Sequence, residues 1–232
     1  MMDWQTLIDT DKQLLLAVNG SASLYLDTLA STLTNALTWV PLYLSLFYMI
    51  VKNNDKVQKI LMILGGVAFC LLMAGAVDDG IVKPLVGRWR PTHDPQIGLM
   101  VDIVDGYRGG RYGFFSAHAA NTFSIAIFFW WLVRSRLLTV AMVIWSLTNC
   151  WTRLYLGVHF PGDILVGLCW GAMTGSLVYW LYYRLYCHYF PKCSYASLNY
   201  TTKGYSRDDI DVPMSVLIFT LLFALVRATF IL

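Results

Sequence analysis

Residues 164–186 read ILVGLCWGAMTGSLVYWLYYRLY, and this stretch decides the fold class. It holds 23 residues with a single charged one, Arg184. About 20 mostly apolar residues in a helix span the hydrocarbon core of a bilayer. Over all 232 residues, 57% are hydrophobic and 13% are charged. Because a soluble domain carries about 25% charged residues, we expect an integral membrane protein.

Further apolar stretches indicate an all-α polytopic membrane bundle of about six transmembrane helices. These stretches are residues 24–51, 57–77, 114–133, 137–151 and 213–231. Residues 4–18 are expected to form an amphipathic helix on the membrane surface, within an interfacial segment at 1–22. Residues 187–212 are expected to form a cytoplasmic loop. No internal repeat is visible, so we expect one membrane domain over 1–232.

Net charge and cysteine spacing exclude several classes of protein. The charge of +3 is too small to indicate nucleic-acid binding, and no long basic block occurs. The five cysteines have no spacing typical of a metal site or a disulfide framework. We therefore expect no nucleic-acid partner, no cofactor and no metal, and the oligomeric state stays open.

Three short motifs lie at the ends of the apolar stretches. Arginine presents a planar fork that matches phosphate oxygens, and lysine adds a mobile point charge, so cations here indicate a phosphate site. The alternative for each cation is an ion pair with Asp78, Asp79 or Asp94, or contact with lipid headgroups. The motifs are Lys83-x6-Arg90-Pro91, Phe115-Ser116-Ala117-His118 and Thr152-Arg153-x5-His159-x3-Asp163.

The second motif is expected at a helix start. The first amides of a helix lack intrahelical partners, and the dipole is positive there, so Ser116 and Ala117 can receive an anion. His118 would then reach a phosphate ester oxygen. A lone interfacial histidine is otherwise a surface or headgroup contact, and the anion-ready helix start favours catalysis.

The third motif pairs a histidine with a carboxylate four residues later. Pro161 suits the first turn of a helix, and His159 and Asp163 share a face if the helix covers both. A carboxylate on one imidazole nitrogen fixes the tautomer and leaves the other nitrogen free to attack. The alternative is that Asp163 only caps the helix.

These residues closely resemble the type-2 phosphatidic acid phosphatase family, whose motifs are K-x6-R-P, P-S-G-H and S-R-x5-H-x3-D. The first motif matches fully. Phe115 replaces proline and Ala117 replaces glycine in the second motif, and Thr152 replaces serine in the third. The hydroxyl and the backbone amide are retained, so these departures leave the chemistry in place and bear on pocket shape and substrate.

The resemblance implies a metal-independent lipid phosphatase with a phosphohistidine intermediate. His159 would attack phosphorus, oriented by Asp163, and His118 would protonate the leaving oxygen. The groups that would hold the phosphate are Lys83, Arg90, Arg153, Ser116 and the amide of Ala117. A soluble haloperoxidase, another branch of the superfamily, fits this membrane composition poorly.

The substrate is expected to be a phosphorylated membrane lipid within the bilayer. Polyprenyl diphosphate and a lipid A-type glycolipid are slightly favoured over phosphatidylglycerol phosphate and phosphatidic acid. The alternative function is a non-catalytic membrane protein that binds phosphorylated headgroups, which the two histidines and Asp163 disfavour. Excess Lys and Arg in the other loops places those loops in the cytoplasm, so we expect a bacterial inner membrane with the site on the periplasmic or external face.

Overall fold

Helices make up the regular structure of residues 3–190 and 198–230, which the computed structural model describes. In these residues two isolated bridges are the sole strand-like pairings. The predicted all-α class is therefore confirmed. The helices are α1 (Trp4–Val18), α2 (Leu24–Thr34), η1 (Ala36–Trp39), α3 (Val40–Lys52), α4 (Val57–Leu71), η2 (Leu72–Ala76), η3 (Asp78–Val82), α5 (Lys83–Val86), η4 (Pro91–His93), η5 (Val104–Gly106), α6 (Ala117–Val133), α7 (Arg136–Tyr155), α8 (Pro161–Tyr189) and α9 (Arg207–Phe230).

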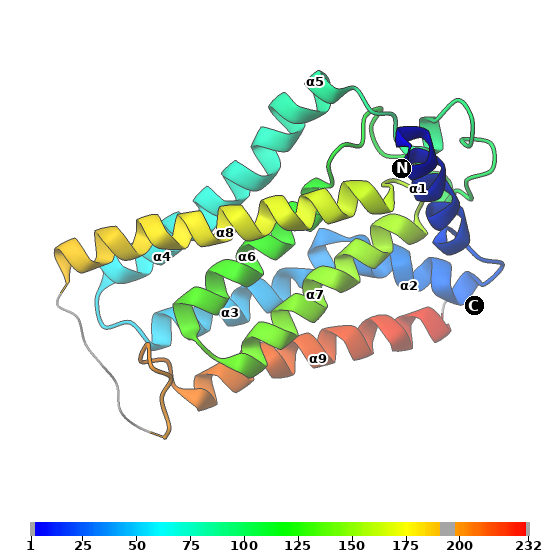
Figure 1. Cartoon of the computed structure of the whole chain (residues 1–232). Helices are drawn as coiled ribbons and strands as arrows, with labels where there is room; N and C mark the ends of the chain where they lie inside the picture. Colours follow the sequence, from blue (N-terminus) through cyan, green and yellow to red (C-terminus); the bar gives the residue numbers. More distant parts are fainter. Residues whose placement is uncertain (1–2, 191–197, 231–232) are drawn as a thin grey trace.

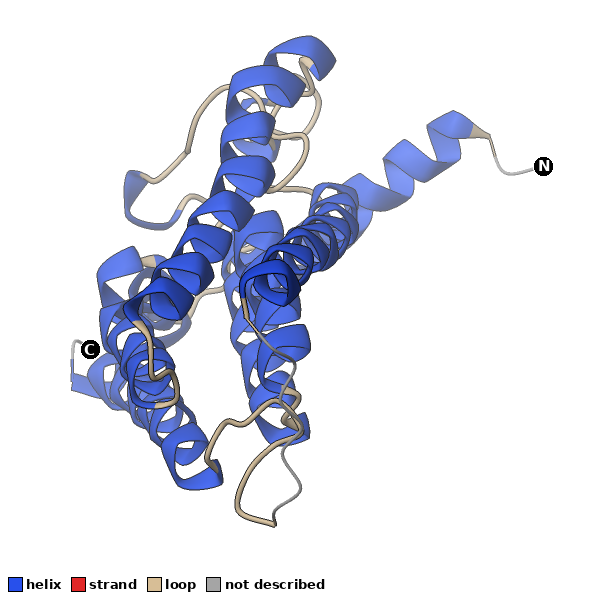
Figure 2. Ribbon diagram, turned by 90° about the vertical axis from the view of Figure 1, so that its left-hand side faces the viewer, coloured by secondary structure: helices blue, strands red, loops and turns tan. Residues whose placement is uncertain are grey.

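The long helices run side by side as a bundle, with α6 and α7 between α8 and α9 (Figure 1). The segments between α5 and α6 and between α7 and α8 lie at the same end of the bundle as α1. The α3–α4 and α6–α7 connections, the end of α8 and the start of α9 lie at the opposite end. Figure 2 shows the first part of α1 extending away from the bundle. All three motifs therefore gather at one end of the molecule.

Fewer helices than the six predicted are long and apolar enough to span a membrane. Among the described residues, four helices are long and apolar enough: Val57–Val86, α7, α8 and α9. Helices α2 and α3 make a fifth span if taken together, but they bend by 66° where Asn35 caps one element and starts the next. Helix α6 has 17 residues and covers about 26 Å at 1.5 Å per residue. The count of six is not confirmed.

Two element boundaries differ from the prediction. The helix expected to end at residue 77 continues through two π-helical turns to Val86, so the first motif begins on a helix and not in a loop. Helix α8 continues to Tyr189 and α9 begins at Arg207, so the predicted 187–212 loop is shorter at both ends. Residues 191–197, inside that loop, and Ile231, the end of the predicted last span, lie outside the described residues.

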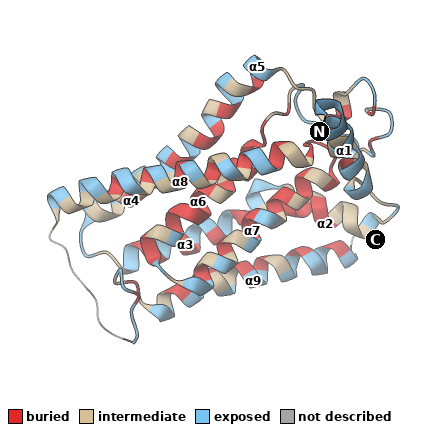
Figure 3. Cartoon of the chain, viewed as in Figure 1, coloured by how far each residue is buried: buried red, intermediate tan, exposed pale blue. Residues whose placement is uncertain are grey.

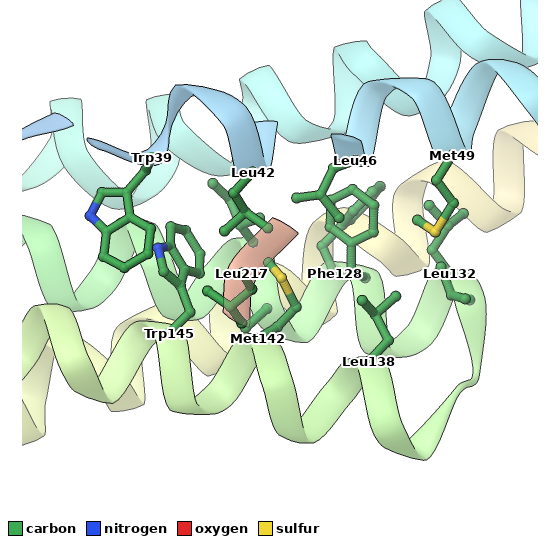
Figure 4. Close-up of a cluster of buried hydrophobic side chains, with 14 of the residues drawn as sticks. Trp39, Leu42, Leu46, Met49, Phe128, Leu132, Leu138, Met142, Trp145 and Leu217 are labelled. Carbon is green, nitrogen blue, oxygen red and sulfur yellow. The ribbon is translucent and has the colours of Figure 1, made fainter. Parts of the chain in front are cut away.

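The largest apolar core lies between α3 and the helices α6, α7 and α9. Figure 4 shows side chains from α3 facing side chains from α6 and α7, with Leu217 of α9 beside them. Trp39 and Trp145 meet edge to face with ring centroids 6.0 Å apart. The buried residues of Figure 3 lie mainly on inward helix faces, while α1 is largely exposed. This core fixes the positions of the helices that carry the second and third motifs.

Three glycines set the distance between α6 and α8. A Cβ at Gly167, Gly171 or Gly175 would lie 2.7, 2.6 or 2.4 Å from the carbonyl oxygens of Ser116, Ala120 and Ser124, respectively. Small residues four apart on one helix face allow two backbones to approach closely. The backbone contact brings the start of α6 next to the start of α8, where the second and third motifs lie.

Candidate active site

The first motif spans the end of the long helix and the extended segment after it. Lys83 opens α5, and its Nζ lies 2.7 Å from Oδ2 of Asp78, with Asp79 as a second acidic partner. The sequence left an ion pair with these carboxylates open for Lys83, and the structure contains it. Arg90 follows in extended backbone.

Arg90 is held beside the second motif by backbone pairing. Its amide donates to the Arg111 carbonyl over 3.1 Å, and the Gly113 amide donates to the Arg88 carbonyl over 2.9 Å. Its Nε donates to the Tyr112 carbonyl over 3.0 Å. The segment leading into α6 therefore runs antiparallel to the first motif and sets the direction of Arg90.

The second motif forms a capped helix start, as predicted. Ser116 is the N-cap of α6, and its buried Oγ accepts from the Ala119 amide over 3.4 Å. Its own amide donates to the Asp163 carbonyl over 3.1 Å, which ties the second motif to the third. Ala117 is the first residue of the helix, and the His118 side chain is exposed.

The third motif crosses from α7 to α8 through a tight turn. Arg153 lies in the last turn of α7, and Asp163 lies in the first turn of α8 with Pro161 at the first helical position. Gly157, between them, has a φ of +64°, a left-handed conformation that favours glycine. This turn directs His159 back into the bundle, where it is 1% exposed.

The structure brings His159 and Asp163 together without a hydrogen bond between them. His159 Nδ1 lies 3.7 Å from Asp163 Oδ2, beyond hydrogen-bond range, because α8 begins after His159 and does not cover both residues. Asp163 Oδ2 accepts from the Phe160 amide over 3.0 Å, so the capping role left open by the sequence is present. Asp163 Oδ1 accepts from Arg88 over 2.7 Å. Nδ1 of His159 is buried and has no hydrogen-bond partner among the described residues.

Arg153 is buried with part of its guanidinium unsatisfied. Nη1 donates to Thr34 Oγ1 over 2.7 Å, and Nη2 donates to the Tyr107 hydroxyl over 3.0 Å. Nε has no partner among the described residues, although the side chain is 2% exposed. Buried polar groups in proteins are normally hydrogen-bonded. This unpaired N–H is therefore available to donate to a bound ligand.

Electrostatics favour an anion between these groups. Burial and the positive charges of Arg90, Arg153 and Lys83 lower the pKa of His159 well below its ordinary value. Burial and the charge of Arg153 also lower the pKa of Arg90. In the described part of the chain neither arginine forms an ion pair within 4.0 Å. A bound anion would offset this repulsion, and a neutral His159 can act as a nucleophile.

His118 faces the same group of charges from the start of α6. It interacts electrostatically with Arg153, His159, Arg90 and Lys83. The eight predicted site residues therefore come together at one end of the bundle. In the described residues, no group of three or more His, Cys, Asp or Glu side chains is placed to hold a metal ion.

Sequence reasoning did not assign roles to three residues that contact this site. Arg88 pairs with Asp163, Asp11 of α1 pairs with Arg88, and Tyr107 bonds Arg153. Arg88 lies inside the first motif, two residues before Arg90, and that position was a usable signal. Asp11 and Tyr107 carry no such signal, because their contacts depend on how distant segments fold together.

All three motifs fall within residues 63–187, which match the family model of the PAP2 superfamily. The chain belongs to the PAP2 superfamily. The resemblance to type-2 phosphatidic acid phosphatases is therefore confirmed, and with it a phosphatase acting on phosphorylated lipids.

Relatives of this PAP2-superfamily chain include two bacterial lipid phosphatases similar over most of its length. Lipid A 4'-phosphatase of Bacteroides thetaiotaomicron is 41% identical over 181 residues, covering 77% of this chain and 80% of the relative. The protein of the same name from Porphyromonas gingivalis is 34% identical, covering 76% and 74%. Decaprenylphosphoryl-5-phosphoribose phosphatase of Mycobacterium tuberculosis is 35% identical over 98 residues, covering 42% of this chain and 50% of the relative. No solved structure matches the chain.

Proposed function

We propose that the chain removes a phosphate monoester from a lipid A-type glycolipid through a phosphohistidine at His159. The two relatives that match most of its length both carry the name lipid A 4'-phosphatase. Lys83, Arg90 and Arg153 come from three separate segments and surround a buried, uncharged histidine. This convergence is the observation that carries the proposal, because a phosphate there would receive three cationic partners at the point of attack.

Phosphate binding precedes the chemistry. The free Nε–H of Arg153 donates to one phosphoryl oxygen, and Arg90 and Lys83 supply further positive charge. The Ser116 hydroxyl hydrogen and the first amides of α6 offer further donors, since Ser116 Oγ acts as an acceptor within its own cap. These groups stabilise the charge that builds on the phosphoryl oxygens in the transition state.

The first chemical step transfers the phosphoryl group to the protein. Nε2 of His159 donates its electron pair to phosphorus, and the bond from phosphorus to the sugar oxygen breaks. His118 gives a proton to that oxygen, and the dephosphorylated lipid leaves. Asp163 Oδ2, 3.7 Å from Nδ1 in the free protein, needs to move by about 1 Å to accept a hydrogen bond from the imidazole.

The second step releases inorganic phosphate. His118, now without its proton, takes one from a water molecule, and the water oxygen attacks phosphorus. The bond from phosphorus to His159 breaks, which returns the imidazole to its neutral form. The positive charge for both steps comes from side chains, so we propose that no metal ion takes part.

A polyprenyl-linked phosphate is the second candidate substrate. The mycobacterial relative that supports it matches less than half of this chain. Polyprenyl diphosphate, phosphatidylglycerol phosphate and phosphatidic acid share the phosphate group that the cations would bind. The lipid A-type substrate is preferred because the similarity to its phosphatases covers about three quarters of the chain.

We place the site on the periplasmic face of a bacterial inner membrane. The opposite end of the bundle carries cations that have no part in the motifs, in agreement with cytoplasmic loops. They are Lys52, Lys56, Lys59, Arg134, Arg136, Arg184, Lys203 and Arg207. A lipid A-type substrate in the outer leaflet of the membrane would then present its phosphate directly to the site.

The experiment is a substrate panel with protein purified in detergent. We expect release of inorganic phosphate from lipid A faster than from undecaprenyl diphosphate, phosphatidylglycerol phosphate and phosphatidic acid, with activity retained in EDTA. His159→Ala should abolish release. A protein that binds phosphorylated lipids and releases no phosphate would instead support the non-catalytic, headgroup-binding alternative. Full activity of His159→Ala would contradict the mechanism.

A further inference from the structure

Asp11 connects the N-terminal helix to the candidate active site. It lies on α1, outside residues 63–187, which match the family model. Its Oδ2 lies 2.6 Å from Nη2 of Arg88, and its Oδ1 accepts from the Gly162 amide over 2.7 Å. Its side chain is 16% exposed. The carboxylate therefore binds both a cation of the first motif and a free amide at the start of α8.

Arg88 carries this connection to the carboxylate beside the proposed nucleophile. Its Nη1 donates to Asp163 Oδ1 over 2.7 Å, while Nη2 faces Asp11. Its Cζ lies 4.3 Å from the centre of the Phe160 ring. The guanidinium therefore packs over this ring and donates to one carboxylate from each Nη atom. A planar guanidinium held by two carboxylates has one orientation, and that orientation sets where Asp163 lies.

Helix α1 is fixed at this position by more than Asp11. Lys12 Nζ lies 3.1 Å from Asp94 Oδ2 and donates to Gln96 over 2.7 Å. Leu15 is fully buried in a cluster with Phe160. An interfacial helix would need only its apolar face, so these polar contacts indicate a second role for α1.

We propose that Asp11 is a positioning residue that acts through Arg88 and Asp163 on the imidazole of His159. The inference rests on the proposed function, because it concerns the same site. Without Asp11, Arg88 would be free to turn fully toward Asp163 and draw its carboxylate away from Nδ1 of His159. The negative charge of Asp11 also offsets the positive charge of Arg88. More of the negative charge of Asp163 is then available to the imidazole of His159.

The test compares three variants of α1 in the lipid phosphatase assay. Asp11→Asn keeps the shape and removes the charge, Asp11→Glu keeps the charge, and Asp9→Asn is the matched control. Asp9 is exposed on the same helix and accepts only from Gln5 in the described structure. We expect Asp11→Asn to lower kcat by about 10- to 100-fold, the equivalent of one charge-assisted hydrogen bond, with KM little changed. Asp9→Asn should match the wild type.

Two further readouts separate positioning from loss of folding. Removing a negative charge beside the site should move the acidic limb of the pH profile of kcat/KM to lower pH. Damaged packing should lower the maximal kcat/KM and leave the pH of this limb unchanged. The charged group that faces Asp11 is Arg88, and the groups that face Asp163 are Arg88, Arg90 and His159. In an Arg88→Gln background, Asp11→Asn should have no further effect, because both act on one path.

The outcomes are distinct for the two proposals. Asp11→Asn with wild-type kcat and pH profile overturns the role of Asp11 and leaves the proposed function in place. If Asp11→Asn melts early, Asp11→Glu decides: recovered kcat supports the role of the charge, and kcat as low as in Asp11→Asn contradicts it. A wild-type protein that releases no phosphate from any lipid overturns both.

Discussion

Arg153 shows how one residue connects burial to the proposed chemistry. Its guanidinium bonds Thr34 and Tyr107 and keeps one N–H free, which a lysine cannot reproduce. We expect Arg153→Lys to lower kcat/KM by roughly 10²- to 10³-fold, the effect of removing one transition-state donor. Arg136→Lys, an exposed change at the far end of the bundle, is the control. Equal phosphate release by Arg153→Lys and the wild type would exclude this donor.

The pKa of His159 gives a prediction for stability. Burial first, then the charges of Arg90 and Arg153, lower the pKa of this histidine below its ordinary value of about 6.5. Below that value the unfolded chain binds a proton that the folded chain does not, so the free energy of unfolding falls as the pH falls. Stability from this group is present above about pH 6.5 and is lost on acidification.

The measurement is a melting curve at pH 7.5 and pH 5.5 for the wild type and His159→Gln. We expect the wild type to lose more thermal stability between these values than the variant, which has no group to protonate at residue 159. An identical loss in the two proteins would mean that His159 takes up its proton in the folded state.

Single residues also mark the limit of prediction from sequence. The eight predicted site residues are recognisable in the sequence because their types suit phosphoryl transfer and their spacings resemble the family motifs. The partners of Asp163 are not, since Arg88 is 75 positions away and the 3.7 Å gap to His159 depends on where α8 begins. Tyr107 likewise reaches Arg153 from 46 positions away. Such contacts follow from tertiary packing, which local spacing does not encode.

Among the elements, the close contact of α6 with α8 positions the second motif. A Cβ at Gly171 would lie 2.6 Å from the Ala120 carbonyl oxygen, so Gly171→Ala should push the helices apart. We expect a loss of about 1–3 kcal/mol of stability and lower activity, because α6 carries Ser116 and His118. Thermal melting and phosphate release measure the two effects.

Gly65→Ala is the matched control for the helix contact. Nothing lies within 4 Å of a Cβ at Gly65, which is also in a helix. Alanine there should be neutral or stabilising by about 0.5–1 kcal/mol. Equal effects of the two substitutions would contradict the importance of the contact between α6 and α8.

Helix boundaries were harder to predict than helix existence. Apolar composition indicates helices α4, α7, α8 and α9, but it does not register the 66° break at Asn35 or the π-helical turns before Lys83. Asn35 lies at the first irregularity and Asp78 and Asp79 lie in the second π-helical turn, whereas the first π-helical turn, Leu72–Ala76, has no polar side chain. The glycines of α8 recur every four residues, but the sequence alone did not single them out, because their role depends on the helix that packs against them.

The whole molecule has two distinct ends, and their placement can be tested by labelling. Leu99 is fully exposed in the segment between α5 and α6, which lies at the motif end, and Lys203 is exposed shortly before the start of α9, which lies at the other end. In a variant without native cysteines, we expect Leu99→Cys to react with a membrane-impermeant maleimide in intact spheroplasts. Lys203→Cys should react only after the membrane is opened. The reverse pattern would place the site in the cytoplasm.

The central claim is that phosphate passes through a covalent bond to His159. The direct measurement uses lipid A labelled with ³²P at its phosphate, with the reaction quenched in base within the first turnovers. We expect an acid-labile label on the wild-type protein and none on His159→Ala. Release of labelled phosphate by His159→Ala at the wild-type rate, with no labelled protein at any time, would contradict it.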